Sequence, residues 1–212
     1  ALGLAQEVAG AIRATGAAPL YVDCNAIAPR TVRLIGETIL AAGGRFADAG
    51  LIGPPPRKPG QTRFYTSGPG AAGFAALGGF GLDVRVIDGE VGAASGLKMC
   101  YGALTKGLQA LGTELLVAAE RMGLAEVLRA EQRESIPDVL GWLERGMPTM
   151  PPKAHRWVGE MEEIATCFAD LGLTPKILLG AADMDPFVPG TPIGQTTPEP
   201  RDRNRRPDLT HP

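Results

Sequence analysis

The apolar positions of the first 88 residues alternate between helical and strand spacing. Helical spacing runs over residues 2–14 and again from Pro29 to Gly43, and a short helix is predicted at 70–77. Short apolar runs that read as strands occupy residues 20–22, 46–49, 62–67 and 82–87. Strands that alternate with helices in this way favour a parallel sheet. We therefore interpret residues 1–88 as the later part of a Rossmann-like α/β domain.

Beyond Gly89 the pattern becomes helical throughout. Helical spacing covers residues 91–122, 124–131, 136–145 and 152–171. The first of these helices would be roughly 45 Å long at about 1.5 Å per residue, and a helix of that length often forms a subunit interface. We expect an all-α substrate and dimerisation domain over residues 89–185, and a homodimer that forms through the long helix.

The last segment, residues 186–212, has the composition of a tail. It contains seven prolines among its 27 residues, a charged run that starts at Arg201, and almost no apolar periodicity. We expect this segment to be extended or disordered.

Composition excludes several classes of function. A formal net charge of −2 leaves no basic surplus for nucleic acid, and no apolar stretch approaches the ~18 residues of a membrane span. The first residues lack a signal-peptide pattern, so we expect a cytoplasmic protein. Three widely spaced cysteines and two histidines give neither a metal-ligand set nor a Ser-His-Asp triad. A small substrate or a protein partner is therefore favoured.

The most informative residue is Lys98, the only charged residue between Glu90 and Lys106. Its neighbours at helical spacing are mostly small, among them Ala94 and Gly102. The lysine also lies near the start of its helix, where the helix dipole favours an anionic substrate. A proton carrier for a hydroxyl-to-carbonyl reaction fits this environment. The alternative is a lysine that merely extends to solvent from a tightly packed helix.

Three motifs resemble those of one enzyme family. The run from Gly89 through Gly92 to Lys98 is similar to the G-x-x-G-x-x-x-x-x-K segment that opens the long helix of β-hydroxyacid dehydrogenases, such as 3-hydroxyisobutyrate and 6-phosphogluconate dehydrogenases. Residues 22–29 (VDCNAIAP) resemble the family's D-x-S-T-x-x-P stretch, and residues 48–54 (DAGLIGP) resemble its D-A-P-V-S-G-G loop. The resemblance covers residues 20–105, and it is nearest to a bacterial branch with a poorly characterised C-terminal domain of the 6-phosphogluconate dehydrogenase type.

The resemblance implies an NAD- or NADP-dependent oxidoreductase that acts on the hydroxyl of a small anionic hydroxy acid. Lys98 would exchange the hydroxyl proton while hydride moves to the nicotinamide. Ile52, Gly53 and Pro54 occupy the substrate-binding positions, but Ile52 replaces a serine and Pro54 has no N–H to donate. The resemblance therefore does not identify the hydroxy acid, and we do not expect it to be 3-hydroxyisobutyrate.

The remaining positions implied by the resemblance depart from the family in part. Gly102 replaces the asparagine four residues after the lysine, so that Tyr101 or another group would supply the polar contact to substrate. Asn25 and Ala26 stand where the family has hydroxyl side chains near the nicotinamide ribose. Arg57 and Lys58 could add a contact to an anion.

The largest departure from the family is the missing nucleotide fingerprint. No strand followed by G-x-G-x-x-G and a helix occurs before Val22, and the glycines at 78–81 lead into a strand instead of opening a helix. We expect a dehydrogenase truncated at its N-terminus. The alternatives are a catalytically silent dimerisation module derived from the family and an imine reductase-like enzyme.

Overall fold

The computed structural model describes residues 1–184, without the side chains of residues 149, 151–156 and 184. The chain folds as two compact units. The first comprises residues 1–105 and 160–179, and the second comprises 106–159 and the residues from 180 onward. The units therefore divide the chain at other points than the predicted boundary after residue 88. The predicted tail at 186–212 lies outside the described residues.

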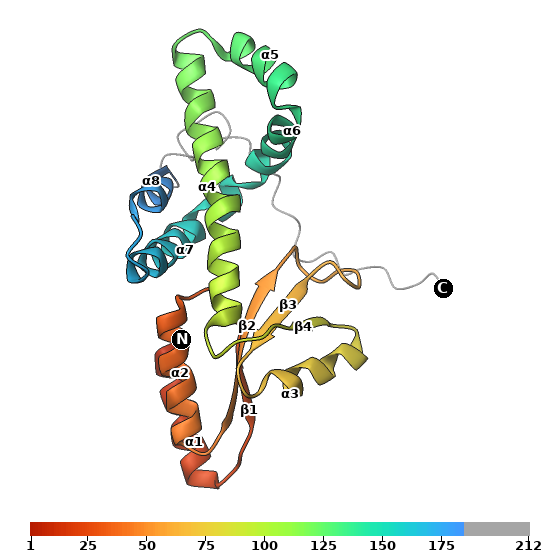
Figure 1. Ribbon diagram of the computed structural model, residues 1–212, viewed down its shortest axis with the longest axis vertical. Coiled ribbons are helices and arrows are strands. Elements are labelled where there is room, and N and C mark those ends of the chain that lie inside the picture. The colour runs from red at the N-terminus through yellow and green to blue at the C-terminus, as the bar shows by residue number, and fades with distance from the viewer. Residues whose placement is uncertain (185–212) are drawn as a thin grey trace, which may run out of the picture. The chain divides into compact units, whose positions relative to one another are not determined.

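The first unit contains a four-stranded sheet (Figure 1). Its strands are β1 (Leu20–Asp23), β2 (Arg45–Ile52), β3 (Arg63–Ser67) and β4 (Asp83–Val86), in the order β1-β2-β3-β4. The predicted partial α/β sheet is confirmed, and β1/β2 and β3/β4 are parallel as expected.

The pair β2/β3 is antiparallel, so the sheet is mixed at the point where the alternation of strands and helices favoured parallel pairing. Segment 53–62, which joins the two strands, contains no helix. A parallel pair needs a crossover of about a dozen residues or more, so this shorter connection returns the chain in the opposite direction.

Helices cover both faces of the sheet (Figure 1). α1 (Leu2–Thr15) and α2 (Pro29–Ala41) pack on the face that carries Phe46, around a core of fully buried aliphatic side chains: Ala5, Ala9, Val32, Ile35 and Ile39. α3 (Ala71–Ala75), continued by the 3₁₀ turn η1 (Ala76–Phe80), places Phe74 against Ala47 and Ala49 on the other face. Because successive β2 side chains alternate between faces, Asp48, Gly50 and Ile52 share the face of Phe46.

The rest of the described chain is helical, which confirms the second part of the fold prediction. Its elements are α4 (Ala93–Arg121), α5 (Ala125–Ser135), α6 (Pro137–Gly146), the 3₁₀ turn η2 (Met147–Thr149), α7 (Pro151–Asp170) and α8 (Lys176–Met184). The sequence patterns did not predict α8, a helix of nine residues. Among the described residues, no helix is both long enough and apolar enough to span a membrane.

Candidate functional site

Asp48 of β2 is fully buried and caps the N-terminus of α4. Its Oδ2 accepts hydrogen bonds from the backbone N–H groups of Gly92 and Ser95, each at 3.0 Å, and its Oδ1 accepts one from the Ser95 hydroxyl at 2.6 Å. A buried carboxylate is stable only when such donors surround it. The first turn of α4 is therefore joined directly to the middle of the sheet.

Ser67 of β3 completes this cap. Its Oγ accepts a hydrogen bond from the Ala94 N–H at 3.0 Å and donates one to Asp48 at 3.3 Å. The Ala93 N–H donates to the Glu90 carbonyl, so all four amides from Gly92 to Ser95 have partners. The sequence analysis had assigned this end of the helix to a substrate anion. The structure places the carboxylate of Asp48 at the first amides of α4, and a substrate anion near Lys98 stays a prediction.

Gly50 lets the strand approach α4 closely. A methyl group added at Gly50 would lie 2.5 Å from the Ala94 carbonyl oxygen and 3.2 Å from Cβ of Lys98. By contrast, a methyl group at Gly96, two residues before Lys98 on the helix, would meet only Pro29 at an ordinary 3.7 Å. The tight contact beside Lys98 therefore comes from the glycine of the strand and not from the glycine of the helix.

Alternate residues of β2, which share one face of the strand, contact successive turns of α4. Asp48 contacts the turn at Gly92–Ser95, and Gly50 contacts the next turn at Ala94 and Lys98. Two strand residues advance about 6.6 Å and one helical turn about 5.4 Å. Two contacts, at Asp48 and at Gly50, therefore join β2 to successive turns at the start of α4.

The loop after β1 carries the predicted cofactor residues Asn25 and Ala26. The buried carboxylate of Asp23 accepts hydrogen bonds from the Asn25 backbone N–H at 2.9 Å and from its side-chain amide at 3.1 Å and 3.2 Å. Further along the loop, the Ala28 N–H donates to Glu163 of α7 at 2.9 Å. The loop is thus anchored at both ends, and Asn25 is exposed between the anchors.

Lys98 lies within electrostatic range of this loop. Cys24 is exposed as a residue, yet partial desolvation of its thiol raises its pKa, and the neighbouring Asp23 carboxylate raises the pKa further. The Lys98 ammonium opposes these effects and lowers the pKa of the same thiol. The pKa of the Cys24 thiol, and with it the reactivity of this thiol, therefore depends on the charge of Lys98.

Replacing Lys98 by methionine should slow the alkylation of Cys24. Loss of the ammonium removes the influence that favours the thiolate, the reactive form, so we expect a rate about two- to five-fold lower at pH 8. The measurement is the iodoacetamide reaction of Cys24 in a background with Cys100→Ser and Cys167→Ser. Lys106→Met is the matched control on the same helix and should leave the rate unchanged. Equal rates for Lys98→Met and Lys106→Met would contradict the proximity of Lys98 to Cys24.

The loop between β2 and β3 carries the other predicted substrate positions, Gly53 and Pro54. Gly53 has a φ of 127° and packs against the carbonyl of Gln61, where a side chain would collide. The Thr62 hydroxyl donates a hydrogen bond to the Pro54 carbonyl. These two contacts close the loop at its base and fix the backbone at the end of β2.

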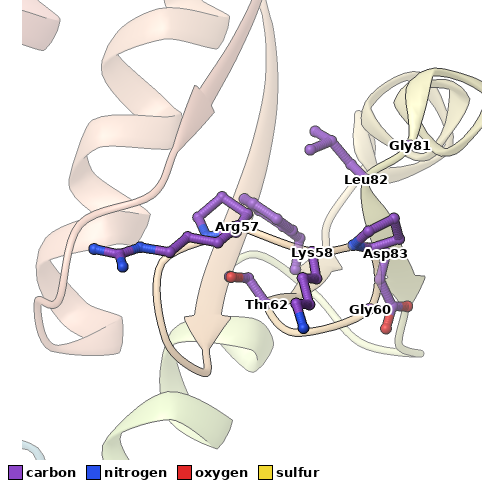
Figure 2. A pocket seen from close by; sticks show the side chains of 10 residues that line it. Arg57, Lys58, Gly60, Thr62, Gly81, Leu82 and Asp83 are labelled. Atoms are coloured by element: carbon purple, nitrogen blue, oxygen red, sulfur yellow. The ribbon is translucent and has the colours of Figure 1, made fainter. Parts of the chain in front are cut away.

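A pocket of about 240 Å³ lies beyond the closed base of this loop, between segment 56–64 and residues 81–83. Figure 2 shows Lys58 and Asp83 at its rim, while the side chain of Arg57 extends away from it. Lys98 is not among the residues that line this pocket. Both cations that were expected to contact an anion, Arg57 and Lys58, are among the residues that line this pocket.

Several residues that build this site were not recognised as functional from the sequence. Asp48 stood in a motif but received no role, and Ser67, Gly50 and Glu163 were not singled out. The signal for Asp48 was available, since it is the single acid within the apolar run of β2 and a buried acid requires donors. No group of three or more His, Cys, Asp or Glu side chains in the described residues is arranged to hold a metal ion.

Known proteins resemble the chain over most of its length. A conserved protein of unknown function, whose structure revealed similarity with 3-hydroxyacid dehydrogenases, is 30% identical and superposes with a TM-score of 0.69. The match covers 87% of this chain and 70% of that protein. The chain belongs to the β-hydroxyacid dehydrogenase-like family.

Other members of this fold extend the comparison. A conserved hypothetical protein from Sinorhizobium meliloti has a TM-score of 0.75 at 24% identity, over 93% of this chain and 67% of that one. The 3-hydroxyisobutyrate dehydrogenase of Mycobacterium tuberculosis, solved with L-serine, has a TM-score of 0.62 at 19% identity, over 87% and 71%. At these identities the likeness establishes the dehydrogenase fold.

Two further matches, found by sequence, each cover part of the chain. Residues 119–186 match the family model described as a domain of unknown function, DUF1932, which agrees with the expected poorly characterised C-terminal domain. An uncharacterised 28.5 kDa protein of Methanothermus fervidus is 35% identical over 109 residues, or 51% of this chain. The match spans 41% of that relative's length.

Proposed function

We propose that this protein is an NAD- or NADP-dependent oxidoreductase that acts on the hydroxyl group of a small anionic hydroxy acid, with Lys98 as the proton carrier. One observation carries the proposal. In a chain of this family, the strand–helix junction built by Asp48 and Gly50 holds Lys98 beside the loop that follows β1. Carboxyl ends of parallel strands are where α/β proteins bind their ligands.

The chemistry of Lys98 follows from this position. When bound, the nicotinamide accepts hydride from the carbon that bears the hydroxyl. The neutral Nζ of Lys98 would take the hydroxyl proton, and in the reverse reaction its ammonium would return it to the carbonyl oxygen. The Asp48 cap and Gly50 keep the lysine backbone fixed while the side chain reaches the substrate.

The loop after β1 fits the nicotinamide end of such a cofactor. Asn25 is exposed there, and because its side-chain N–H groups bond to Asp23, its side-chain oxygen would be the atom that accepts a hydrogen bond from the cofactor. Ala26 would contribute backbone groups. The glycines at 78–81 do not fit the pyrophosphate, because η1 ends at Phe80 and Gly81 terminates that turn with a φ of 92°. Under this proposal the described residues would contact the nicotinamide end of the cofactor, and the glycines at 78–81 would not hold its pyrophosphate.

The substrate would lie against the end of β2. The backbone at Ile52 and Gly53 offers groups for a carboxylate, whereas Pro54 contributes only a carbonyl, which Thr62 already binds. Ile52 is buried and presents an apolar wall where the family has a serine. The half-exposed Tyr101 supplies a hydroxyl on the helix side, next to the small Gly102. This combination favours a hydroxy acid with an apolar substituent.

The test of the proposed function is a substrate screen. The purified protein is incubated with NAD⁺ or NADP⁺ and a panel of small 2- and 3-hydroxy acids, and the absorbance of the reduced nicotinamide is followed. The 212-residue chain is titrated in parallel with NADH and NADPH by fluorescence. Turnover of at least one hydroxy acid supports the proposal. Nucleotide binding without turnover of any hydroxy acid in the panel would contradict the proposed substrate class. Absence of nucleotide binding up to millimolar concentration would favour the catalytically silent dimerisation module.

A further inference from the structure

One face of α4 packs against the start of α2, and Cys100 lies on that face. A methyl group at Gly92, the residue before α4, would lie 3.3 Å from Pro29, and one at Gly96 would lie 3.7 Å from the same proline. Cys100 follows Gly96 by four residues, so its side chain lies on the same side of the helix. The side of α4 that carries Cys100 therefore faces α2.

One face of α7 is attached to the same part of α2. The Ala28 N–H donates a hydrogen bond to Glu163 at 2.9 Å, and the Arg30 guanidinium pairs with Asp170 at 3.3 Å. Cys167 stands between these two acids, at intervals of four and three residues, and so lies on the same face of α7. Two helices that are distant in sequence thus direct a cysteine each toward the start of α2.

The two thiols share a cavity at this place. Cys100 and Cys167 both line a cavity of about 360 Å³, together with Pro29 and Gly96, and all four residues belong to the first unit. Burial raises the pKa of the Cys167 thiol, and the neighbouring Cys100 raises it further. The two sulfur atoms are therefore close enough for the charge of one to influence the ionisation of the other.

The exposure of the two cysteines differs. Cys100 is exposed, so a dissolved oxidant can reach its sulfur. Cys167 is only 7% exposed, and its raised pKa keeps it in the thiol form. The third cysteine, Cys24, does not line this cavity. The arrangement gives one accessible sulfur that can be oxidised first and one protected sulfur that can react with the oxidised form.

We propose that Cys100 and Cys167 form a reversible disulfide when the protein is exposed to a hydroperoxide. With hydrogen peroxide, the Cys100 sulfur attacks the O–O bond, the S–O bond of a sulfenic acid forms, and the thiol proton leaves with the other oxygen as water. The Cys167 sulfur then attacks the sulfenic sulfur. The S–S bond forms, and the second thiol proton leaves with the hydroxyl group as another water. The two thiols lose two electrons, which the O–O bond accepts, and a dithiol reductant reverses the reaction.

The disulfide would change the stability of the fold. It would join α4, two residues after Lys98, to α7, and would close the segment 101–166 into a loop. A cross-link between residues so far apart in the sequence restricts the unfolded chain and so favours the folded state. This inference rests on the convergence of α4 and α7 and does not depend on the proposed oxidoreductase activity.

The experiment uses the full chain with Cys24→Ser, in which Cys100 and Cys167 are the only cysteines. The protein is treated with hydrogen peroxide, alkylated, digested with trypsin and analysed by mass spectrometry. We expect peptide 99–106 to be linked to peptide 157–176, and the linked pair to disappear after treatment with dithiothreitol. The midpoint of thermal unfolding should rise by at least about 5 °C in the oxidised protein.

The matched control adds Cys167→Ser to this variant. Without the second sulfur, we expect the sulfenic acid of Cys100 to persist, so that dimedone traps it, and we expect the unfolding midpoint not to rise. Two results would overturn the proposal. One is Cys100 oxidised to sulfinic acid, or linked to the Cys100 of another chain, while Cys167 remains a thiol. The other is a pair of thiols that hydrogen peroxide leaves unchanged.

Discussion

Asp48→Ala is expected to lower the free energy of unfolding by at least about 3 kcal/mol. The substitution leaves the amides of Gly92 and Ser95 and the hydroxyl of Ser95 without their buried acceptor, and hydrogen bonds to a charged group contribute about 1.5–3 kcal/mol each. Urea denaturation followed by circular dichroism measures the change. Hydrogen exchange should also speed up at the first amides of α4, because that turn loses its attachment to β2.

Asp48→Asn is the matched control for this prediction. The asparagine carbonyl can still accept from the two amides, and its NH₂ group can donate to the Ser95 oxygen. We expect a loss of only about 1 kcal/mol, the size of one neutral hydrogen bond. If Asp48→Ala cost no more than Asp48→Asn, the carboxylate would not be the cap that fixes α4.

Gly50→Ala is expected to destabilise the protein by about 2–3 kcal/mol, the range found for overpacked cores. The added methyl group meets the Ala94 carbonyl at 2.5 Å, and neither a strand backbone nor a capped helix can yield easily. The strand and α4 must separate, which also moves Lys98 away from the loop after β1. Urea denaturation gives the stability change, and the alkylation rate of Cys24 reports the displacement of the lysine.

Gly10→Ala in α1 provides the contrast. A methyl group at Gly10 would have no atom within 4 Å, so the same substitution should stabilise the protein by up to about 1 kcal/mol through helix propensity. A Gly50→Ala variant as stable as Gly10→Ala would show that the strand and α4 do not meet as closely as described.

The architecture was largely predictable because hydrophobic spacing reports which face of each element is buried. The strands and the helices up to residue 171 were placed from that spacing alone, and their order was confirmed. The direction of β3 was missed although segment 53–62 is too short for a parallel crossover, and the way in which this segment closes was not visible in the hydrophobic spacing. That closure rests on Gly53 meeting Gln61 and on the Thr62 hydroxyl, contacts that carry no periodic signal.

The candidate site was predictable only where a single residue carries the chemistry. Lys98 stood out because it is an isolated charge among small residues. The residues that position Lys98 lie on two strands that are far from it in the sequence. They are Asp48 and Gly50 on β2 and Ser67 on β3. A contact between a strand and the start of a later helix produces no periodic pattern in the sequence. These residues are therefore seen to be neighbours only in the folded structure.

The same junction joins stability to the proposed activity. The contacts of Asp48 and Gly50 fix the position of α4 relative to β2, and Lys98 lies on the second turn of that helix. Changes at the junction should therefore reduce both the stability of the fold and the placement of the proton carrier. Changes to the Lys98 side chain leave the junction contacts of Asp48 and Gly50 in place, so they should reduce turnover without separating the strand from the helix.

The most direct test of the central claim compares the turnover of Lys98→Met with that of the wild type, using the best hydroxy acid from the substrate screen. The account predicts that kcat falls by a factor of about 10² to 10⁴, the usual contribution of a positioned acid–base group, while nucleotide affinity and the unfolding midpoint stay the same. A Lys98→Met enzyme that keeps wild-type kcat would show that another group carries the proton, and Lys98 would lose its proposed role.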